Sequence, residues 1–262
     1  MSTKLFLITA GCFVLLSVFL AILLNGKGSY QPPLNTVNER GVAVVELFTS
    51  EGCSSCPPAD QLLSDLKAGM TGKNVFLLAL HVDYWNYLGW KDRFSDSAYS
   101  ARQNRYASVL HAEVYTPQMI VNGKSVFVGS DRSQANEAIL DAVKNPAAIQ
   151  IKIQSAFEKN ERVKIHFNIP GDLSDELLNI ALVQHDAVTS VLRGENKGRK
   201  LNHVNVVRSL ISIPASPDGT QEISFPSELE NQTVTIICFT QDKNSLTVSG
   251  AASQEVVLTP GN

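Results

Sequence analysis

The chain has 262 residues, which is long enough for two domains, and a formal net charge of −3. This balance excludes the strongly basic surface on which nucleic-acid binding depends, so we expect no nucleic-acid partner. Its four cysteines are too few for a fold held together by several disulfides. A cysteine pair in this chain is therefore expected to act at one site and not to stabilise the whole fold.

The N-terminal segment 5–24 contains no charged residue and is almost wholly apolar. As a helix it is about 30 Å long, which matches the core of a bilayer. Because Lys4 precedes it, the positive-inside rule predicts a membrane anchor with a cytoplasmic N-terminus, followed by a linker over 26–40 and an exported remainder in the cell envelope. Two alternatives stay open: a cleaved signal peptide, although no A-x-A-like site follows, and lipidation at Cys12, because residues 9–12 faintly resemble a lipobox.

A strand, a turn, a C-x-x-C pair and an amphipathic helix follow one another between residues 42 and 66. The apolar run 42–48 is rich in β-branched residues and is typical of a buried parallel strand. The helix after the cysteines has apolar residues at helical spacing, namely Ala59, Leu62, Leu63 and Leu66. A thiol at a helix N-terminus is stabilised as a thiolate by unpaired N–H groups and the helix dipole. We therefore predict a solvent-facing nucleophile at Cys53 and a resolving thiol at Cys56; the alternative is a static structural disulfide.

The next stretch continues in the manner of an α/β domain. A second buried strand after the helix predicts a right-handed βαβ unit. The Asn122-Gly123 pair predicts a hairpin. The expected elements are, in order, a strand over 75–82, a polar helix over 95–111, hairpin strands over 118–121 and 124–128, and a helix capped by Ser133.

This order of elements resembles the thioredoxin fold with a helical insertion before the proline. The segments ELFTSEGCSSCPPAD, HVDYWNYLGWKD, YTPQMIVNG and GENKGRKLNHVNVVR resemble a family of secreted thioredoxin-like proteins known only as a domain of unknown function, over residues 41–258. The resemblance implies that the bond between Thr116 and Pro117 is cis and that this proline sits against the C-x-x-C loop. It also implies that Glu46 accepts the proton of Cys56; the alternative is a glutamate at an exposed strand end.

The sequence changes character after residue 147. Short runs with partial alternation are separated by turn signals such as Pro-Gly-Asp and Ser-Pro-Asp-Gly, which is typical of an antiparallel sandwich. The predicted fold class is therefore an α/β thioredoxin-like domain with a helical insertion over 41–146, followed by an all-β immunoglobulin-like sandwich over 147–262. Cys238 lies in one of these runs and shares a face with Ile236, so we expect it to be a buried free thiol.

Several polar and aromatic residues near the end of the second strand are further candidates. His81 and Asp83 end this strand at the edge where α/β sites assemble. His81 or His111 could complete a metal site with the two cysteines, as in copper chaperones on this fold, but those commonly space their cysteines one residue wider. We expect a hydrogen-bonded structural histidine instead, with no metal and no cofactor. The aromatic residues that follow, Tyr84, Trp85, Tyr87 and Trp90, either form an apolar lip for a polypeptide or pack in the core.

The segment 193–199 is basic and contains two glycines, but it lacks the pattern of a phosphate-binding loop. We expect it, together with His203, to form a structured connection that packs against the first domain.

The function that these features favour is thiol–disulfide exchange in the cell envelope. Cys53 would attack a substrate disulfide, Cys56 would resolve the mixed disulfide, and Pro117 would present a backbone edge to the substrate chain. The expected partners are an exported polypeptide or thiol substrate, a redox partner of unknown identity, and the membrane through the N-terminal segment. Two alternatives remain: a non-catalytic envelope binding module whose Cys53–Cys56 disulfide is structural, and a copper chaperone.

Overall fold

The strand before the C-x-x-C pair is the centre of the first half of the fold. In a computed structural model that describes residues 41–70, 72–158 and 162–258, β1 (Ala43–Thr49) pairs in parallel with β2 (Val75–His81). The helix α2 (Pro57–Gly69) connects them, as predicted. On its other side, β1 pairs antiparallel with β3 (Gln118–Val121), which forms a hairpin with β4 (Ser125–Val128).

Two further helices belong to this half of the chain. A short 3-10 helix (Asn86–Leu88) leads into α3 (Ser97–Leu110), the predicted polar helix, and α4 (Arg132–Ala142) follows the hairpin. The N-cap of α4 is Asp131, whose carboxylate accepts a hydrogen bond from the Gln134 backbone N–H, and not Ser133 as the sequence suggested.

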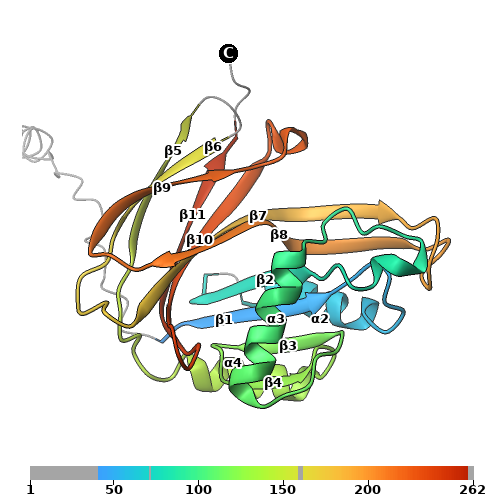
Figure 1. The fold of residues 1–262 in the computed structure, drawn as a ribbon, viewed down its shortest axis with the longest axis horizontal. Coiled ribbons are helices and arrows are strands. Elements are labelled where there is room, and N and C mark those ends of the chain that lie inside the picture. Colours follow the sequence, from blue (N-terminus) through green and yellow to red (C-terminus); the bar gives the residue numbers. More distant parts are fainter. Residues whose placement is uncertain (1–40, 71, 159–161, 259–262) are drawn as a thin grey trace, which may run out of the picture. The chain divides into compact units, whose positions relative to one another are not determined.

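The strands of the second half extend the same sheet. These strands are β7 (Glu176–Ser190), β8 (Lys200–Pro214), β10 (Thr233–Asp242) and β11 (Val248–Val257). Together with the first half they make an eight-stranded sheet in the order β11-β10-β7-β8-β2-β1-β3-β4 (Figure 1). The remaining strands form a three-stranded sheet, ordered β5 (Lys152–Glu158), β6 (Arg162–Asn168), β9 (Asp218–Ser224), and a 3-10 helix (Ser227–Leu229) follows β9.

The predicted thioredoxin-like domain followed by a separate immunoglobulin-like sandwich is wrong. The two halves are joined because β8 lies parallel to β2, with Ala79 opposite Val206. The Asn205 side-chain amide also donates to the Leu77 carbonyl oxygen at 3.1 Å. The physical reason is that β2 would otherwise be an edge strand with unpaired N–H and C=O groups, and β8 covers that edge.

Buried apolar side chains lie on both faces of the long sheet. One face of β1 packs under α2 and α4, and the other packs with residues of α3, β7 and β10. A third cluster lies between the three-stranded sheet and β7, β10 and β11. Cys238 is a buried free thiol in this third cluster together with Ile236, as predicted, and burial raises the pKa of Cys238 to about 12.

The predicted membrane anchor over 5–24, the linker over 26–40 and Cys12 lie outside the described residues. Among the residues that the structure does describe, no helix has both the length and the apolar character needed to cross a bilayer.

Glu46 occupies the middle of β1 and faces away from α2. Its neighbours Val45 and Leu47 pack in the cluster that contains α2, so alternation along the strand directs Glu46 to the opposite face. There Glu46 is only 1% exposed and forms an ion pair with Arg102 of α3, while the Tyr106 hydroxyl donates to its carboxylate at 2.5 Å. Glu46 is therefore neither at an exposed strand end nor on the side of the sheet that carries the cysteines.

This buried ion pair gives a test of what holds α3 on the sheet. We expect Arg102→Met to lower the free energy of unfolding by about 3–5 kcal/mol, because it leaves the Glu46 carboxylate buried without a cation. Urea denaturation of the purified chain measures this value. The double variant Glu46→Gln/Arg102→Met removes both charges and should recover most of the loss. An equal loss in both variants would assign the effect to the packing of the Arg102 stem.

Candidate functional site

Cys53 and Cys56 form a disulfide at the start of α2. Cys56 is the N-cap residue of the helix, and Cys53 lies in the turn that precedes it. Both cysteines are 0% exposed, whereas Ser54 and Ser55 between them are exposed. The prediction of a solvent-facing Cys53 is therefore wrong for this oxidised state.

The start of α2 offers fewer free N–H donors than an ordinary helix. Pro57 and Pro58 occupy the first two helical positions, where their fixed φ suits the helix but they carry no N–H. The next two N–H groups, those of Ala59 and Asp60, donate to the Cys56 carbonyl oxygen at 2.8 and 3.1 Å. The stabilisation of a Cys53 thiolate by unpaired helix N–H groups, which the sequence suggested, therefore has few donors to draw on.

The turn between β7 and β8, residues 193–199, covers the disulfide loop and is called the cap turn below. The Asn196 side-chain amide, fully buried, donates to the carbonyl oxygens of Glu51 at 2.9 Å and Cys53 at 2.8 Å. The Glu195 carboxylate accepts a hydrogen bond from the Ser54 N–H at 3.0 Å, and hydrogen bonding by the Ser54 side chain and backbone lowers the pKa of Glu195. The expected packing of this segment against the first half of the chain is confirmed.

A second covering comes from the loop before β3. The Thr116–Pro117 peptide bond is cis, as predicted. The Trp85 indole N–H donates to the Thr116 hydroxyl at 2.7 Å, and a Cβ on Gly52 would lie 2.9 Å from the Trp85 Cβ. The buried Pro117 is close to the first turn of α2, because a Cβ on Gly129 would lie within 3.2 Å of both Pro117 and Ala59.

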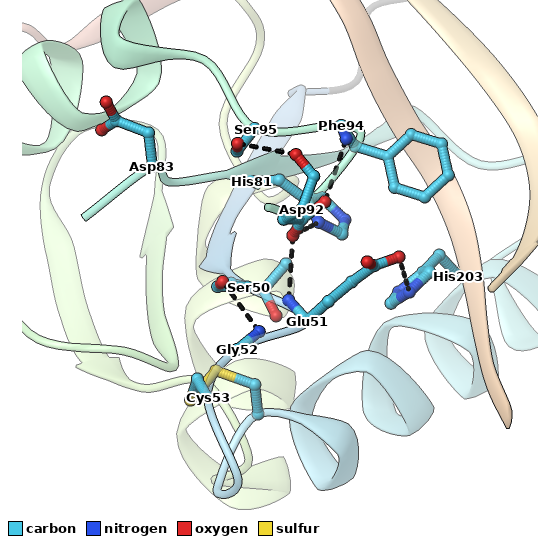
Figure 2. A network of polar contacts seen from close by, with 12 residues as sticks. Ser50, Glu51, Gly52, Cys53, His81, Asp83, Asp92, Phe94, Ser95 and His203 are labelled. Atoms are coloured by element: carbon cyan, nitrogen blue, oxygen red, sulfur yellow. Dashed lines mark hydrogen bonds and ion pairs between the residues drawn. A yellow bond between two sulfur atoms is a disulfide. The ribbon is translucent and has the colours of Figure 1, made fainter. Parts of the chain in front are cut away.

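Five ionisable side chains are buried beside this loop. They come from five different segments and form what we call the acid–histidine cluster: Glu51, Asp60, His81, Asp92 and His203. Figure 2 labels all of them except Asp60. None of them is more than 7% exposed. The Trp90 indole N–H donates to the Glu51 carboxylate at 2.7 Å, which ties the second tryptophan to the same cluster.

His81 and Asp92 make the shortest contact in the cluster. The His81 Nδ1 and an Asp92 carboxylate oxygen lie 2.7 Å apart. Asp92 also accepts hydrogen bonds from the backbone N–H groups of Glu51 and Phe94, each at 2.9 Å. Burial would lower the pKa of His81, but the Asp92 carboxylate raises it above its usual value. Burial would likewise raise the pKa of Asp92, but His81 and the two N–H groups hold it below its usual value.

His203 lies between two carboxylates without a hydrogen bond to either. Its Nε2 is 3.5 Å from a Glu51 oxygen, and its Nδ1 is 3.7 Å from an Asp60 oxygen. Among the described residues, neither ring nitrogen nor this Glu51 oxygen has a hydrogen-bond partner. Burial raises the pKa of Asp60, although His203, His81 and the Thr49 hydroxyl oppose this effect. Buried groups held only by such long ion pairs are poorly compensated, so this part of the interior costs stability.

Asp60 is the acid on the side of the sheet that carries the cysteines. It follows Cys56 by one helical turn, and its N–H donates to the Cys56 carbonyl oxygen at 3.1 Å. Sequence reasoning missed this residue, together with Glu51 and Asp92. One signal was available: Asp60 interrupts the apolar face of α2, and a buried polar residue on an apolar face is informative.

The other predicted site residues have separate surroundings. The Asp83 carboxylate accepts a hydrogen bond from the Ser100 hydroxyl at 2.5 Å, and His111 is the exposed C-cap of α3. His81 is the hydrogen-bonded structural histidine that we expected. Within the described part of the chain, no group of three or more histidine, cysteine, aspartate or glutamate side chains is arranged to hold a metal ion.

The His81–Asp92 pair predicts how stability depends on pH. Folding raises the pKa of His81 above 6.5, so its contribution is present below pH 6.5 and is lost as the pH rises through the folded value. Folding lowers the pKa of Asp92 below 3.8, so its contribution is present above pH 3.8 and is lost as the pH falls through the folded value. We expect urea denaturation to show both losses.

A variant separates the His81 contribution from that of Asp60, whose raised pKa also makes stability fall as the pH rises above 3.8. His81→Asn should lower the free energy of unfolding at pH 6 by about 3–5 kcal/mol, because it leaves Asp92 buried without its cation. This deficit should shrink above pH 6.5. His166→Asn, on the exposed side of β6, is the matched control. A deficit that stays constant with pH would contradict the assignment.

One comparison with known proteins gives a family, described as of unknown function. The family model described as "Protein of unknown function (DUF1223)" matches residues 44–241. The crystal structure of protein AGR_C_4864 from Agrobacterium tumefaciens is 25% identical, with a TM-score of 0.56 over 85% of this chain and 96% of that chain. No curated protein matched the sequence.

Two other solved structures match with low similarity. A domain of the outer membrane lipoprotein Omp28 from Porphyromonas gingivalis is 14% identical, with a TM-score of 0.25 over 44% of this chain and 100% of that chain. The chicken interferon gamma receptor alpha chain is 10% identical, with a TM-score of 0.28 over 54% of this chain and 59% of that chain. Neither likeness supports an argument. Because the family match runs from β1 into β10 and includes every residue of the site, the chain belongs to the family described as protein of unknown function (DUF1223).

Proposed function

We propose that this protein carries out thiol–disulfide exchange through Cys53 and Cys56. The observation that carries the proposal is the burial of the acid–histidine cluster beside the disulfide. Buried and incompletely paired ionisable groups cost stability, so their position next to a cysteine pair supports a role in proton transfer. A disulfide that served only as a cross-link would need no such neighbours.

The exchange proceeds in two balanced steps when the protein is reduced. The Cys53 thiolate attacks a substrate disulfide, the bond from Cys53 to one substrate sulfur forms, and the other substrate sulfur leaves as a thiolate. The Cys56 thiol then gives its proton to Asp60, and the Cys56 thiolate attacks the Cys53 sulfur. The Cys53–Cys56 bond forms, the substrate leaves as a second thiolate, and two electrons have passed from protein to substrate. The reverse sequence oxidises a dithiol substrate.

The size of the closed loop also bears on this proposal. The two cysteines are separated by three positions in the sequence. For so short a loop the chain-entropy model gives about 2 kcal/mol of stabilisation, compared with about 4.7 kcal/mol for a loop of 100 residues. A cross-link at this position therefore adds little rigidity to a sheet of eight strands.

A second candidate function is a binding module of the cell envelope whose disulfide is structural. The observation that favours it is the complete burial of both cysteines. For exchange to occur, the cap turn must move away from the disulfide loop, which breaks the hydrogen bonds of Asn196 and Glu195 to that loop. The two Asn196 bonds are buried and the Glu195 bond is exposed, and a local opening that breaks these three bonds costs less than global unfolding.

The location and partners that we propose follow from the N-terminal segment. A protein with a persistent disulfide belongs in an oxidising compartment. Export with an N-terminal anchor over 5–24 would place residues after 40 outside the cytoplasm, with an exported polypeptide or thiol as substrate and a second redox protein to restore the starting state.

Protease treatment of intact spheroplasts tests this orientation. We expect externally added protease to digest the chain, because its folded part lies outside the cytoplasmic membrane. A cytoplasmic marker protein in the same sample controls for lysis. Full protection of the chain would contradict export, whereas a soluble product that begins near residue 25 would contradict only the anchor.

Cysteine variants test the exchange mechanism. Cys56→Ser should accumulate mixed disulfides with exported proteins, because nothing remains to resolve them, and Cys53→Ser should accumulate none. Non-reducing electrophoresis after acid quenching measures the adducts. Cys238→Ser is the matched control, since that thiol is buried in a separate core and should not affect trapping.

The role of Asp60 is tested in the otherwise unchanged protein. Asp60→Asn should slow the resolving step about 10²-fold, in the range of general acid–base catalysis, while the first attack by Cys53 keeps its rate. Stopped-flow measurement of Trp85 and Trp90 fluorescence separates the two steps.

The cysteine variants also decide between the two candidate functions. If Cys56→Ser folds normally and forms no adducts, the exchange mechanism is contradicted and the structural disulfide is the better explanation.

A further inference from the structure

The cap turn carries positive charges that are not used by the fold. Arg193 and Lys197 of this turn, and Lys200 directly after it, are exposed, and within the described residues none of them has an acidic partner. Lys91 is a fourth such residue. It follows Trp90, whose Cβ would lie 3.4 Å from a Cβ on Gly194, so it is next to the cap turn.

Six cations elsewhere on the described surface form ion pairs, whereas Lys73, Lys124 and Lys152 have no acidic partner and lie on three separate segments. The pairs elsewhere on the surface are Lys67–Asp186, Arg93–Glu228, Arg132–Asp65, Lys144–Asp141, Arg162–Glu222 and Lys243–Asp175. The one acid on the cap turn, Glu195, is already bound to the Ser54 N–H. Acidic residues nearby, such as Glu51 and Asp92, are buried. The surface around the disulfide is therefore locally positive on a chain whose net charge is −3.

Two exposed apolar side chains flank the same surface. Leu192 is 67% exposed and directly precedes the cap turn. Tyr87 is 79% exposed, two residues after Trp85, the residue that packs against Gly52 of the disulfide loop. Exposed large apolar residues beside unpaired cations are typical of a surface that binds another chain.

We propose that this basic and apolar surface selects acidic polypeptide segments as the substrates of the disulfide, a proposal that rests on the exchange function proposed above. An unpaired positive surface attracts an anionic segment and orients its sulfur toward the loop of Cys53 and Cys56. A basic segment meets like charge at the same place. Glu195 and Asn196 of the cap turn hydrogen-bond to the Ser54 N–H and the Cys53 carbonyl oxygen. These bonds hold the cations of the cap turn against the disulfide loop.

The experiment compares two short peptides that differ only in acidic or basic residues on either side of one cysteine. Each peptide carries thionitrobenzoate as a mixed disulfide, and the protein is the full chain with Cys56→Ser in a non-ionic detergent. The Cys53 thiolate attacks the peptide sulfur, the Cys53–peptide disulfide forms, and thionitrobenzoate leaves as a coloured thiolate. We expect the acidic peptide to react about tenfold faster at low ionic strength, and the preference to shrink as salt screens the charges.

Matched variants locate the effect. Arg193→Gln/Lys197→Gln should remove most of the preference, whereas Lys124→Gln/Lys152→Gln, which removes the same charge from the hairpin and from β5, should keep it. Equal rates for both peptides would overturn the inference and leave the exchange function standing. No release from either peptide would contradict the exchange function itself.

An anionic lipid is the competing occupant. If the surface binds lipid, mixed micelles that contain an anionic lipid bind the full chain and bind Arg193→Gln/Lys197→Gln less tightly. Both peptides then react at equal rates. That result would also overturn the inference.

Discussion

The pairing of β8 with β2 is the constraint on which the site depends. It brings a strand from the second half of the chain to the edge of the first, with Val206 opposite Ala79. Because strand geometry fixes the positions of neighbouring residues, His203 then reaches the cluster beside the disulfide, and the turn that precedes β8 reaches the disulfide loop itself. A β8 displaced from this edge would leave the disulfide loop without the cap turn, and Glu51 and Asp60 without the histidine between them.

The site combines incompletely bonded ionisable groups with a well-bonded disulfide loop. His203 has long ion pairs and no hydrogen bond among the described residues, so its charge is only partly compensated. At the disulfide loop, the equally buried Asn196 amide donates to two carbonyl oxygens at once. The far side of β1 shows the opposite arrangement, because Arg102 and Tyr106 fully satisfy Glu46. The strand β1 therefore separates a fully hydrogen-bonded buried charge from a group of buried ionisable side chains that is only partly hydrogen-bonded.

Local patterns were enough to predict much of the first half of the fold. The β-branched run 42–48, the apolar spacing of α2 and the Asn122-Gly123 turn depend on neighbours in sequence, and each produced the expected element. The resemblance correctly implied the cis bond before Pro117.

The joining of the two halves could not be predicted. The register of β8 is set by a strand far away in the sequence, with Val206 opposite Ala79, and no local hydrophobic pattern indicates that pairing. The partners of His203 and Asn196 depend on this pairing and were missed with it. The surroundings of Glu46 could not be predicted for a different reason: strand alternation places it on the face opposite Val45 but does not say which face α2 covers.

The covered disulfide changes what controls its reactivity. If only the open form of the cap turn exposes Cys53, the observed exchange rate is the intrinsic rate multiplied by the fraction of open molecules. A substrate that binds the open form better raises that fraction. The same binding event then selects the substrate and exposes Cys53. The unpaired cations on the cap turn are then well placed for both, because an acidic segment can attract Arg193 and Lys197 while its own carboxylate competes with Glu195 for the Ser54 N–H. A small neutral thiol gains neither effect and should meet the closed form most of the time.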